Sequence, residues 1–139
     1  MDCSSKFREL CIPLYRNYIL SGVKFPITKY TPRKKSSGLI YYIKLTISSK
    51  DIQGNYSKKV LYKIGYTSRT VQHRINTLNL SSNIKVKVIA ILKFNKVVDA
   101  YHVEQLLHKE YGKWNYKGKK VIESGYTELY VKDVLGFDI

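Results

Sequence analysis

Cysteine is scarce in this sequence, and long apolar runs are absent. The two cysteines, Cys3 and Cys11, lie near one terminus and make neither a disulfide framework nor a zinc site. No apolar run approaches the ~18 residues that a membrane span needs, and the N-terminus lacks the apolar core of a signal peptide. We therefore expect an intracellular protein with free thiols and no membrane partner.

The motifs of several enzyme classes are also absent. The chain has no glycine-rich phosphate loop, no Gly-x-Ser-x-Gly turn and no His-Glu-x-x-His pair. It has no internal repeat and no low-complexity tract. Its 139 residues fit one domain, which at this length buries roughly two thirds of its unfolded surface and folds without disulfides or metals.

Acidic residues are few as well. Ten Asp and Glu stand against 25 Lys and Arg, so the formal net charge is +15. Such an excess favours a polyanionic partner, and nucleic acid is a simpler choice than an anionic membrane surface. Thirteen tyrosines support this slightly, because exposed tyrosines stack on bases or donate hydrogen bonds to phosphates, whereas buried ones belong to the core.

Hydrophobic periodicity predicts a hairpin that leads into a helix. Two runs rich in β-branched and aromatic residues flank a polar connection over 48–59, in which Gly54-Asn55 marks a turn. A short amphipathic helix, a third strand and a longer helix follow, and Gly112 ends that helix. The predicted strands cover 38–45, 60–66 and 84–92, and the predicted helices cover about 71–78, with a cap at Thr67, Ser68 or Thr70, and about 100–111, with a cap at Asp99.

Residues 1–37 are predicted to form a helical arm and a basic linker. A helix from about Pro13 to Ser21 would end at Gly22, and the linker would either follow phosphates or simply connect. Residues 38–139 would form the main domain. We thus predict an α/β fold with a small three-stranded, mainly antiparallel sheet, flanked by helices and preceded by the arm.

The hairpin resembles a signature of known nucleases. Ile40-Tyr41-Tyr42-Ile43 followed by Lys63-Ile64-Gly65 is similar to the paired signature of the GIY-YIG nuclease superfamily. It is closer to the branch, common in phages and large DNA viruses, in which the second tyrosine is a lysine. The resemblance covers about 38–131 and extends to a helix with arginine, a helix with glutamate and a late glutamate. It implies an endonuclease that uses one Mg²⁺ or Mn²⁺ ion.

The resemblance implies that Tyr41 assists deprotonation of the attacking water. A free tyrosine has a pKa near 10 and is a poor base, so a nearby cation such as Lys63 would help by favouring the anion. A desolvated lysine either has a depressed pKa or is paired with an anion. The alternatives are that Tyr41 is a core aromatic and that Lys63 guards a sheet edge.

The resemblance also implies roles for one arginine and two glutamates. Arg74 would bind the scissile phosphate, with Arg69 and His73 as alternatives because the spacing differs by one residue from some relatives. Glu104 would hold the metal ion, unless it is an ordinary solvated helix charge. Glu128 matches the late glutamate of this branch and would orient the site or brace a neighbouring cation.

Further basic and aromatic residues are candidates for contacts with nucleic acid. His108, one turn after Glu104, would support the metal site, donate to a phosphate or merely end the helix. Trp114 lies among lysines and is either a core residue or part of a loop that touches nucleic acid. The candidate contacts are Tyr66, Arg69, His108, Lys113, Lys117, Lys119 and Lys120.

The sequence therefore predicts a metal-dependent endonuclease, with double-stranded DNA as its simplest partner. Two alternatives stay open. One is a binding module that has a nuclease-like fold and does not cut, since net charge fits both functions. The other is an RNA nuclease, since nothing in the sequence distinguishes the two sugars. No dedicated recognition element stands out, so we expect low sequence specificity or recruitment by a partner.

Overall fold

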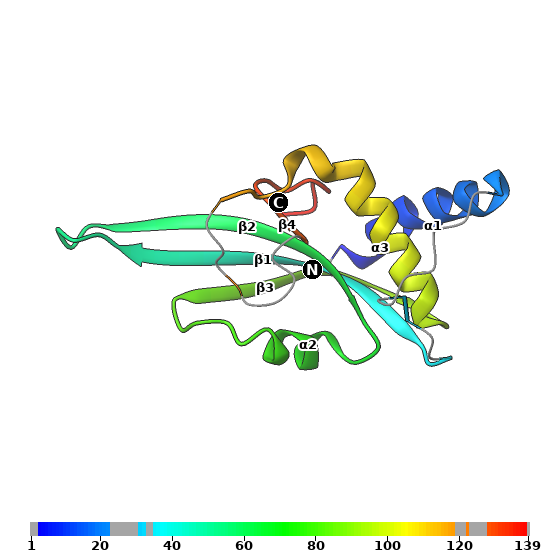
Figure 1. Ribbon diagram of the computed structural model, residues 1–139, viewed down its shortest axis with the longest axis horizontal. Helices are drawn as coiled ribbons and strands as arrows, with labels where there is room; N and C mark the ends of the chain where they lie inside the picture. Colours follow the sequence, from blue (N-terminus) through cyan, green and yellow to red (C-terminus); the bar gives the residue numbers. More distant parts are fainter. Residues whose placement is uncertain (1–2, 23–30, 33–34, 119–121, 123–127, 139) are drawn as a thin grey trace.

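The computed structural model describes residues 3–22, 31–32, 35–118, 122 and 128–138. An antiparallel sheet with strand order β3-β1-β2-β4 lies at its centre, and helices cover both faces (Figure 1). None of the helices in these ranges has the length and apolarity to cross a bilayer. The elements in chain order are α1 (Ser4–Ser21), β1 (Gly38–Lys50), β2 (Tyr56–Thr67), α2 (Val71–Thr77), β3 (Ile84–Phe94), α3 (Val97–Tyr111), the 3₁₀ helix η1 (Gly112–Trp114) and β4 (Leu129–Tyr130).

β1 and β2 form a longer hairpin than the sequence predicts. They pair in one unbroken register out to Lys50 opposite Tyr56, so the predicted connection of 48–59 shrinks to a loop of 51–55. Asp51 Oδ1 closes this loop by accepting hydrogen bonds from two backbone N–H groups, at 2.9 and 2.8 Å. The outer strand ends escape prediction because they are largely exposed and carry no apolar alternation.

The sheet has four strands where the sequence predicts three. The additional strand, β4, contains only Leu129 and Tyr130, which pair with Lys63 and Tyr62 of β2. Two residues are too few for hydrophobic periodicity to reveal a strand, because alternation needs at least four positions. The prediction of three strands is therefore wrong by one edge strand, while the antiparallel arrangement is confirmed.

The two predicted helices after the hairpin are present. Thr70 caps α2, as one of the three predicted candidates, by accepting a hydrogen bond from the His73 backbone N–H at 3.1 Å. α3 begins at Val97, three residues before the predicted start, so Asp99 lies in its first turn and is not its cap. The Asp99 carboxylate instead accepts a hydrogen bond from the Tyr15 hydroxyl at 2.6 Å, which ties α3 to α1.

Side chains alternate between the two faces of β1 and so build two cores. Tyr41 points to the face that α2 covers, where Leu61 and Leu78 are also buried. Tyr42 points to the opposite face, as the alternation predicts, and joins the core beneath α1 and α3. Both tyrosines are fully buried. The sheet is thus covered on both sides, which explains why the centre of β1 is almost continuously apolar.

α1 begins at Ser4, well before the predicted start near Pro13. Pro13 is tolerated inside the helix because it lies on the exposed side, where the carbonyl that loses its hydrogen bond can meet water. Gly22 ends the helix in a left-handed conformation with φ of 73°, as predicted. Phe7 and Cys11 are fully buried in the core that α3 also lines. The division at residue 37 stays a prediction.

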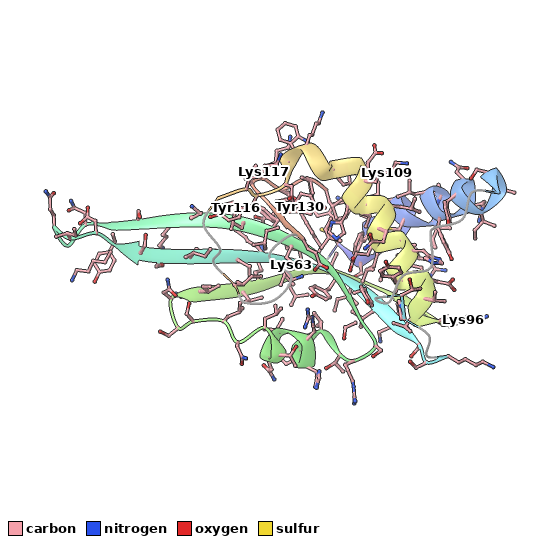
Figure 2. All side chains as sticks on the ribbon, in the orientation of Figure 1. Lys63, Lys96, Lys109, Tyr116, Lys117 and Tyr130 are labelled. Carbon is pink, nitrogen blue, oxygen red and sulfur yellow. The ribbon has the colours of Figure 1, made fainter. Side chains whose placement is uncertain are left out.

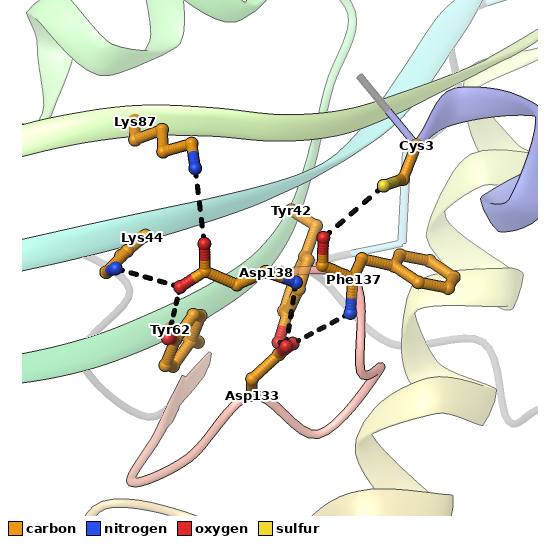
Figure 3. A network of polar contacts seen from close by, with 8 residues as sticks. All are labelled: Cys3, Tyr42, Lys44, Tyr62, Lys87, Asp133, Phe137 and Asp138. Carbon is orange, nitrogen blue, oxygen red and sulfur yellow. Dashed lines mark hydrogen bonds and ion pairs between the residues drawn. The ribbon is translucent and has the colours of Figure 1, made fainter. Parts of the chain in front are cut away.

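The segment 131–138 closes the core beneath α1 and α3 (Figure 3). Asp133 and Asp138 of this segment accept hydrogen bonds from tyrosines of β1 and β2, and Asp138 also forms ion pairs with lysines of β1 and β3. One short segment is thus tied to three strands. Such a contact set joins residues far apart in sequence and leaves no local signal. The contacts are Tyr42 to Asp133 at 2.6 Å, Tyr62 to Asp138 at 2.7 Å, Lys44 to Asp138 at 2.8 Å and Lys87 to Asp138 at 3.2 Å.

We expect Asp138→Asn to lower the melting temperature by several degrees at neutral pH. Hydrogen bonds from Lys44 and Tyr62 hold the pKa of the Asp138 carboxyl at about 2, below the ordinary value of about 3.9. Because folding favours the ionised form, this stabilisation is complete above about pH 4 and is lost as the pH falls towards 2.

The measurement is a set of melting curves of both proteins across this pH range. The two melting temperatures should converge on acidification, and Glu110→Gln, which alters an exposed carboxylate of α3, should behave like the wild type. A difference between wild type and Asp138→Asn that stays constant down to low pH would contradict the assignment.

Candidate active site

Lys63 of β2 is fully buried, which is rare for a lysine. Its Nζ forms an ion pair with Glu128 and lies 5.5 Å from the centroid of the Tyr41 ring. Burial alone would lower its pKa, but the charge of Glu128, together with Tyr41 and Glu104, outweighs burial and raises it. Lys63 therefore stays protonated at neutral pH. Its burial excludes the alternative that it guards an exposed sheet edge.

Gly65 makes room for the Tyr41 side chain. The two residues lie directly opposite each other in the β1–β2 register, so their side chains point to the same face. A Cβ at Gly65 would lie 2.3 Å from the Tyr41 hydroxyl oxygen and 2.4 Å from Cζ. The phenol thus lies over β2 where any other residue would have a side chain. The hydroxyl is buried and has no hydrogen-bond partner among the described residues.

Glu104 of α3 is almost fully buried, with 1 % of its surface exposed. Its Oε1 accepts a hydrogen bond from the Gln105 amide at 3.0 Å and lies 3.4 Å from His108 Nε2. Its Oε2 is buried and unpartnered within the described part of the chain. Burial raises the pKa of Glu104, and Glu128 adds to this, while His108 and Lys63 offset only part of the shift. A buried anionic oxygen without a partner is costly, and a bound cation would relieve that cost.

Three potential metal ligands converge at this point. Glu104, His108 and Glu128 each offer an atom, and the three atoms lie within 4.8 Å of one another. His108 Nδ1 is hydrogen-bonded to the Tyr130 hydroxyl, and the two rings stack with centroids 5.6 Å apart, which leaves Nε2 facing Glu104. Carboxylate oxygens are the ligands that Mg²⁺ and Mn²⁺ prefer. The donor set, with its unpartnered Glu104 oxygen, therefore fits one such ion.

Tyr66 links this cluster to Arg74 of α2. Its ring packs edge-on against Tyr101 of α3, with centroids 5.3 Å apart. Burial raises the pKa of Tyr66, the charge of Glu104 raises it further, and the charge of Arg74 opposes both. The hydroxyl is thus within electrostatic range of both charged groups. Arg74 is half-buried, and its Nη1 lies 3.2 Å from Thr77 Oγ1.

The two alternatives to Arg74 are both exposed. His73 lies on the outer side of α2, as its position relative to the apolar stripe predicts. Arg69 precedes α2 and lines a surface pocket of about 520 Å³ between the start of β1 and the end of β3. Of the three residues, Arg74 is the one whose charge acts on Tyr66.

The remaining candidate contacts lie outside the cluster. Lys113 is exposed, and its Nζ lies 5.2 Å from the centroid of the Trp114 ring. Trp114 is half-buried against the core, in line with its reading as a core residue. Lys117 is exposed at the end of η1 (Figure 2), and Lys119 and Lys120 fall outside the described residues.

Tyr130 is the member of the cluster that sequence reasoning missed. It is fully buried, and burial raises its pKa above the ordinary value, with a further contribution from Glu104. It follows Glu128 by two residues, so strand alternation would have placed both side chains on one side if β4 had been recognised. Figure 2 shows Tyr130 and Lys63 in the middle of the molecule, where the sheet meets α3.

The comparisons with known proteins point to one family. The family model of the T5orf172 domain matches residues 38–135, which include all four strands and the charged cluster of β2, α3 and β4. The comparisons with curated proteins and with solved structures returned no match. Because the matched region is well over half of the sequence, the chain belongs to the T5orf172 domain family, a phage-associated family of nuclease-like domains.

Proposed function

We propose that the protein is a metal-dependent endonuclease that hydrolyses DNA phosphodiester bonds with a site of the GIY-YIG type. One observation carries this proposal: the buried cluster in which Glu104 keeps an oxygen unpartnered by any described residue, beside Lys63 and Glu128. Strongly perturbed, buried titratable groups gather at functional sites more often than elsewhere. The nuclease-like family and the net charge of +15 support the same conclusion.

In this proposal Tyr41 first gives its own proton to solvent. As the phenolate it then takes one proton from the attacking water and becomes the neutral phenol again. Its hydroxyl makes no hydrogen bond to any described residue, so it can engage a group of the substrate. Lys63 cannot take the proton, because it stays protonated. Its ammonium group instead favours the phenolate form of Tyr41 from which the transfer starts, and Glu128 holds Lys63 in place through their ion pair.

Arg74 would contact the scissile phosphate from α2, since a guanidinium can bind two phosphate oxygens at once. Its charge would stabilise the additional negative charge that develops on the phosphate during attack. The Tyr41 hydroxyl and Glu104 Oε2 are both buried, so the phosphate must displace a covering side chain. Tyr66 is the candidate on the side of Glu104, because it is half-buried and packs against Tyr101 of α3.

One Mg²⁺ or Mn²⁺ ion would be held by Glu104, with Glu128 and His108 as further ligands or as groups that orient Glu104. When bound, the ion would supply Lewis-acid stabilisation of charge on the phosphate and on the leaving oxygen. Glu128 would then have two tasks, since its other partner is Lys63.

The proposal is tested by nicking of supercoiled plasmid at low salt. Wild type should nick with Mg²⁺ or Mn²⁺ and be inactive in EDTA. Glu104→Gln should slow nicking by about a hundredfold or more, since each 1.4 kcal/mol of lost transition-state stabilisation is tenfold in rate. Glu110→Gln, which alters an exposed carboxylate on the same helix, should retain full activity.

A second readout separates loss of function from loss of fold. Because the pKa of Glu104 is raised, the ionised carboxylate destabilises the native state, and stability falls as the pH rises through that pKa. In EDTA at pH 8, Glu104→Gln should therefore melt at or above the temperature of the wild type. Plasmid that stays intact but shifts in a gel would favour the binding module, and cleavage of RNA alone would favour the RNA nuclease.

A further inference from the structure

The outer end of the β1–β2 hairpin projects from the body of the protein (Figure 1). β3 pairs with β1 only as far as Ile47, which lies opposite Ile84. Beyond that point residues 48–58, which we term the ribbon, form two paired strands and a loop, and no other described strand pairs with them. Asn83 is hydrogen-bonded to Ser48 at the base of the ribbon, but beyond this point the ribbon contributes little to the core, so its side chains are available to a partner.

One face of the ribbon is basic. In the register, Lys50 lies opposite Tyr56 and Ser48 lies opposite Lys58, and Lys85 of β3 lies opposite Thr46. Because side chains alternate along a strand and directly paired residues share a face, the three lysines and Tyr56 lie on the same side. All four are exposed, and none of the ion pairs among the described residues involves these lysines. We term Lys50, Lys58 and Lys85 the basic ribbon face.

The tip of the ribbon exposes large side chains with apolar surface. Ile52 is as exposed as in an extended peptide, at 106 %, and Tyr56 is 76 % exposed. Lys50 Nζ lies 5.5 Å from the centroid of the Tyr56 ring. Lys50 and Lys58 share the ribbon with this isoleucine and tyrosine, and Asp51 also lies at its tip, so a purely apolar partner does not suit this surface. These side chains suit a partner whose surface carries anionic groups, with stacked rings or methyl groups between those charges.

We propose that the ribbon enters the major groove of duplex DNA next to the cleavage site, an inference that rests on the proposed function. The major groove is ~8.5 Å deep and admits a two-stranded ribbon. The ribbon lies lengthwise in the groove, where the three β1 residues beyond Ile47, at ~3.3 Å each, cover ~10 Å or about three base pairs. The basic ribbon face contacts phosphates at the groove edge, and Ile52 and Tyr56 reach base edges.

The geometry of β2 sets the distance between this contact and the site. Lys63 and Tyr56 are seven positions apart on one continuous strand, which corresponds to ~23 Å. At ~3.4 Å per base pair, the ribbon touches DNA about seven base pairs to one side of the scissile phosphate. The contact is therefore one-sided and lies outside the reach of the candidate catalytic residues.

The test is equilibrium binding of a fluorescent 30-base-pair duplex in EDTA at 50–200 mM KCl. The variant Lys50→Ser/Lys58→Ser/Lys85→Ser should bind one to two orders of magnitude more weakly at about 100 mM salt. Its log–log salt dependence should be shallower by about 2.7, because each lost phosphate contact removes about 0.9. Ile52→Ser should weaken binding severalfold without changing that slope, because it removes no charge.

The matched control is Lys6→Ser/Lys96→Ser/Lys109→Ser, which removes the same charge from α1 and from the two ends of α3, distant from the ribbon (Figure 2). It should change neither the slope nor the affinity more than about threefold. Equal losses of DNA binding in the two triple variants would overturn the proposal. So would a wild-type dimer, seen by sedimentation, that Ile52→Ser dissociates, since the tip would then contact a second copy of the chain.

Failure here is distinguishable from failure of the proposed function. Binding in EDTA reports on the ribbon alone, whereas plasmid nicking reports on the site. A ribbon effect without nicking would leave the contact between ribbon and DNA standing and remove the cleavage site beside it. Nicking by the wild type, together with unchanged DNA binding by the triple-lysine ribbon variant, would support the nuclease and rule out the contact between ribbon and DNA.

Discussion

Lys63→Met is expected to lower the free energy of unfolding by about 3–5 kcal/mol and to abolish nicking. Methionine matches the length of the aliphatic stem, but it removes the one cation that forms an ion pair with Glu128 among the described residues. Two carboxylates, Glu128 and Glu104, would then lie close together without a cation, and uncompensated buried charges cost about this much. A loss of 3–5 kcal/mol corresponds to about 10–17 °C in melting temperature for a domain of 139 residues.

The pH dependence identifies the cause. Burial already raises the pKa of Glu104, and Lys63→Met removes a charge that lowers it, so the stability difference between Lys63→Met and wild type should shrink as the pH falls and Glu104 becomes protonated. Adding Glu128→Gln to Lys63→Met should restore much of the stability and none of the activity, which a double-mutant cycle measures. Lys59→Met, which changes an exposed lysine of the same strand, is the control. Equal melting temperatures for Lys63→Met and wild type would refute the buried ion pair.

Gly65→Ala is expected to abolish nicking although it adds a single methyl group. That methyl group would lie 2.3 Å from the Tyr41 hydroxyl oxygen, so the ring must move. The ring is fully buried among apolar side chains and cannot swing into solvent. Overpacking of this kind costs about 1–3 kcal/mol, and displacement of the proposed base by 1 Å would cost about a hundredfold in rate.

The comparison variants separate strain from chemistry. Gly112→Ala adds a methyl group where nothing lies within 4 Å and should be neutral in stability and activity. Tyr41→Phe should lose nicking while keeping its fold, because the hydroxyl has no hydrogen-bond partner among the described residues. DNA binding in EDTA should be unchanged in both Gly65→Ala and Tyr41→Phe. Normal nicking by Gly65→Ala would show that the position of the phenol over β2 is unimportant.

The hairpin and its first helix were predictable because their information is local. The alternation that separates Tyr41 from Tyr42 is visible in the sequence, and so is the threonine that caps α2. Lys63 was conspicuous for the same reason, since a lysine inside an apolar strand needs an anionic partner. That Glu128 is this partner came from the family resemblance as one of several options, and the structure selects it.

What escaped prediction depends on contacts between distant residues. β4 is a strand only because Leu129 and Tyr130 meet the edge of β2, and Tyr130 joins the site only through that pairing. The early start of α1 depends on the burial of Phe7 and Cys11 by elements that come much later in the chain. The sequence therefore singled out side chains that the structure brings close together, among them Lys63, Glu104 and Glu128, more readily than it revealed the elements that carry them.

Cys3 and Phe137, close to the two ends of the described residues, lie side by side. The Cys3 backbone N–H donates to the Ile89 carbonyl at 3.0 Å, and its thiol donates to the Phe137 carbonyl at 3.3 Å, so β3 and both terminal segments meet at one place (Figure 3). That place is far from the hairpin tip (Figure 1). A surface anchor, a dye or a fused domain attached at either end would emerge from the same side, leaving the ribbon free to meet DNA.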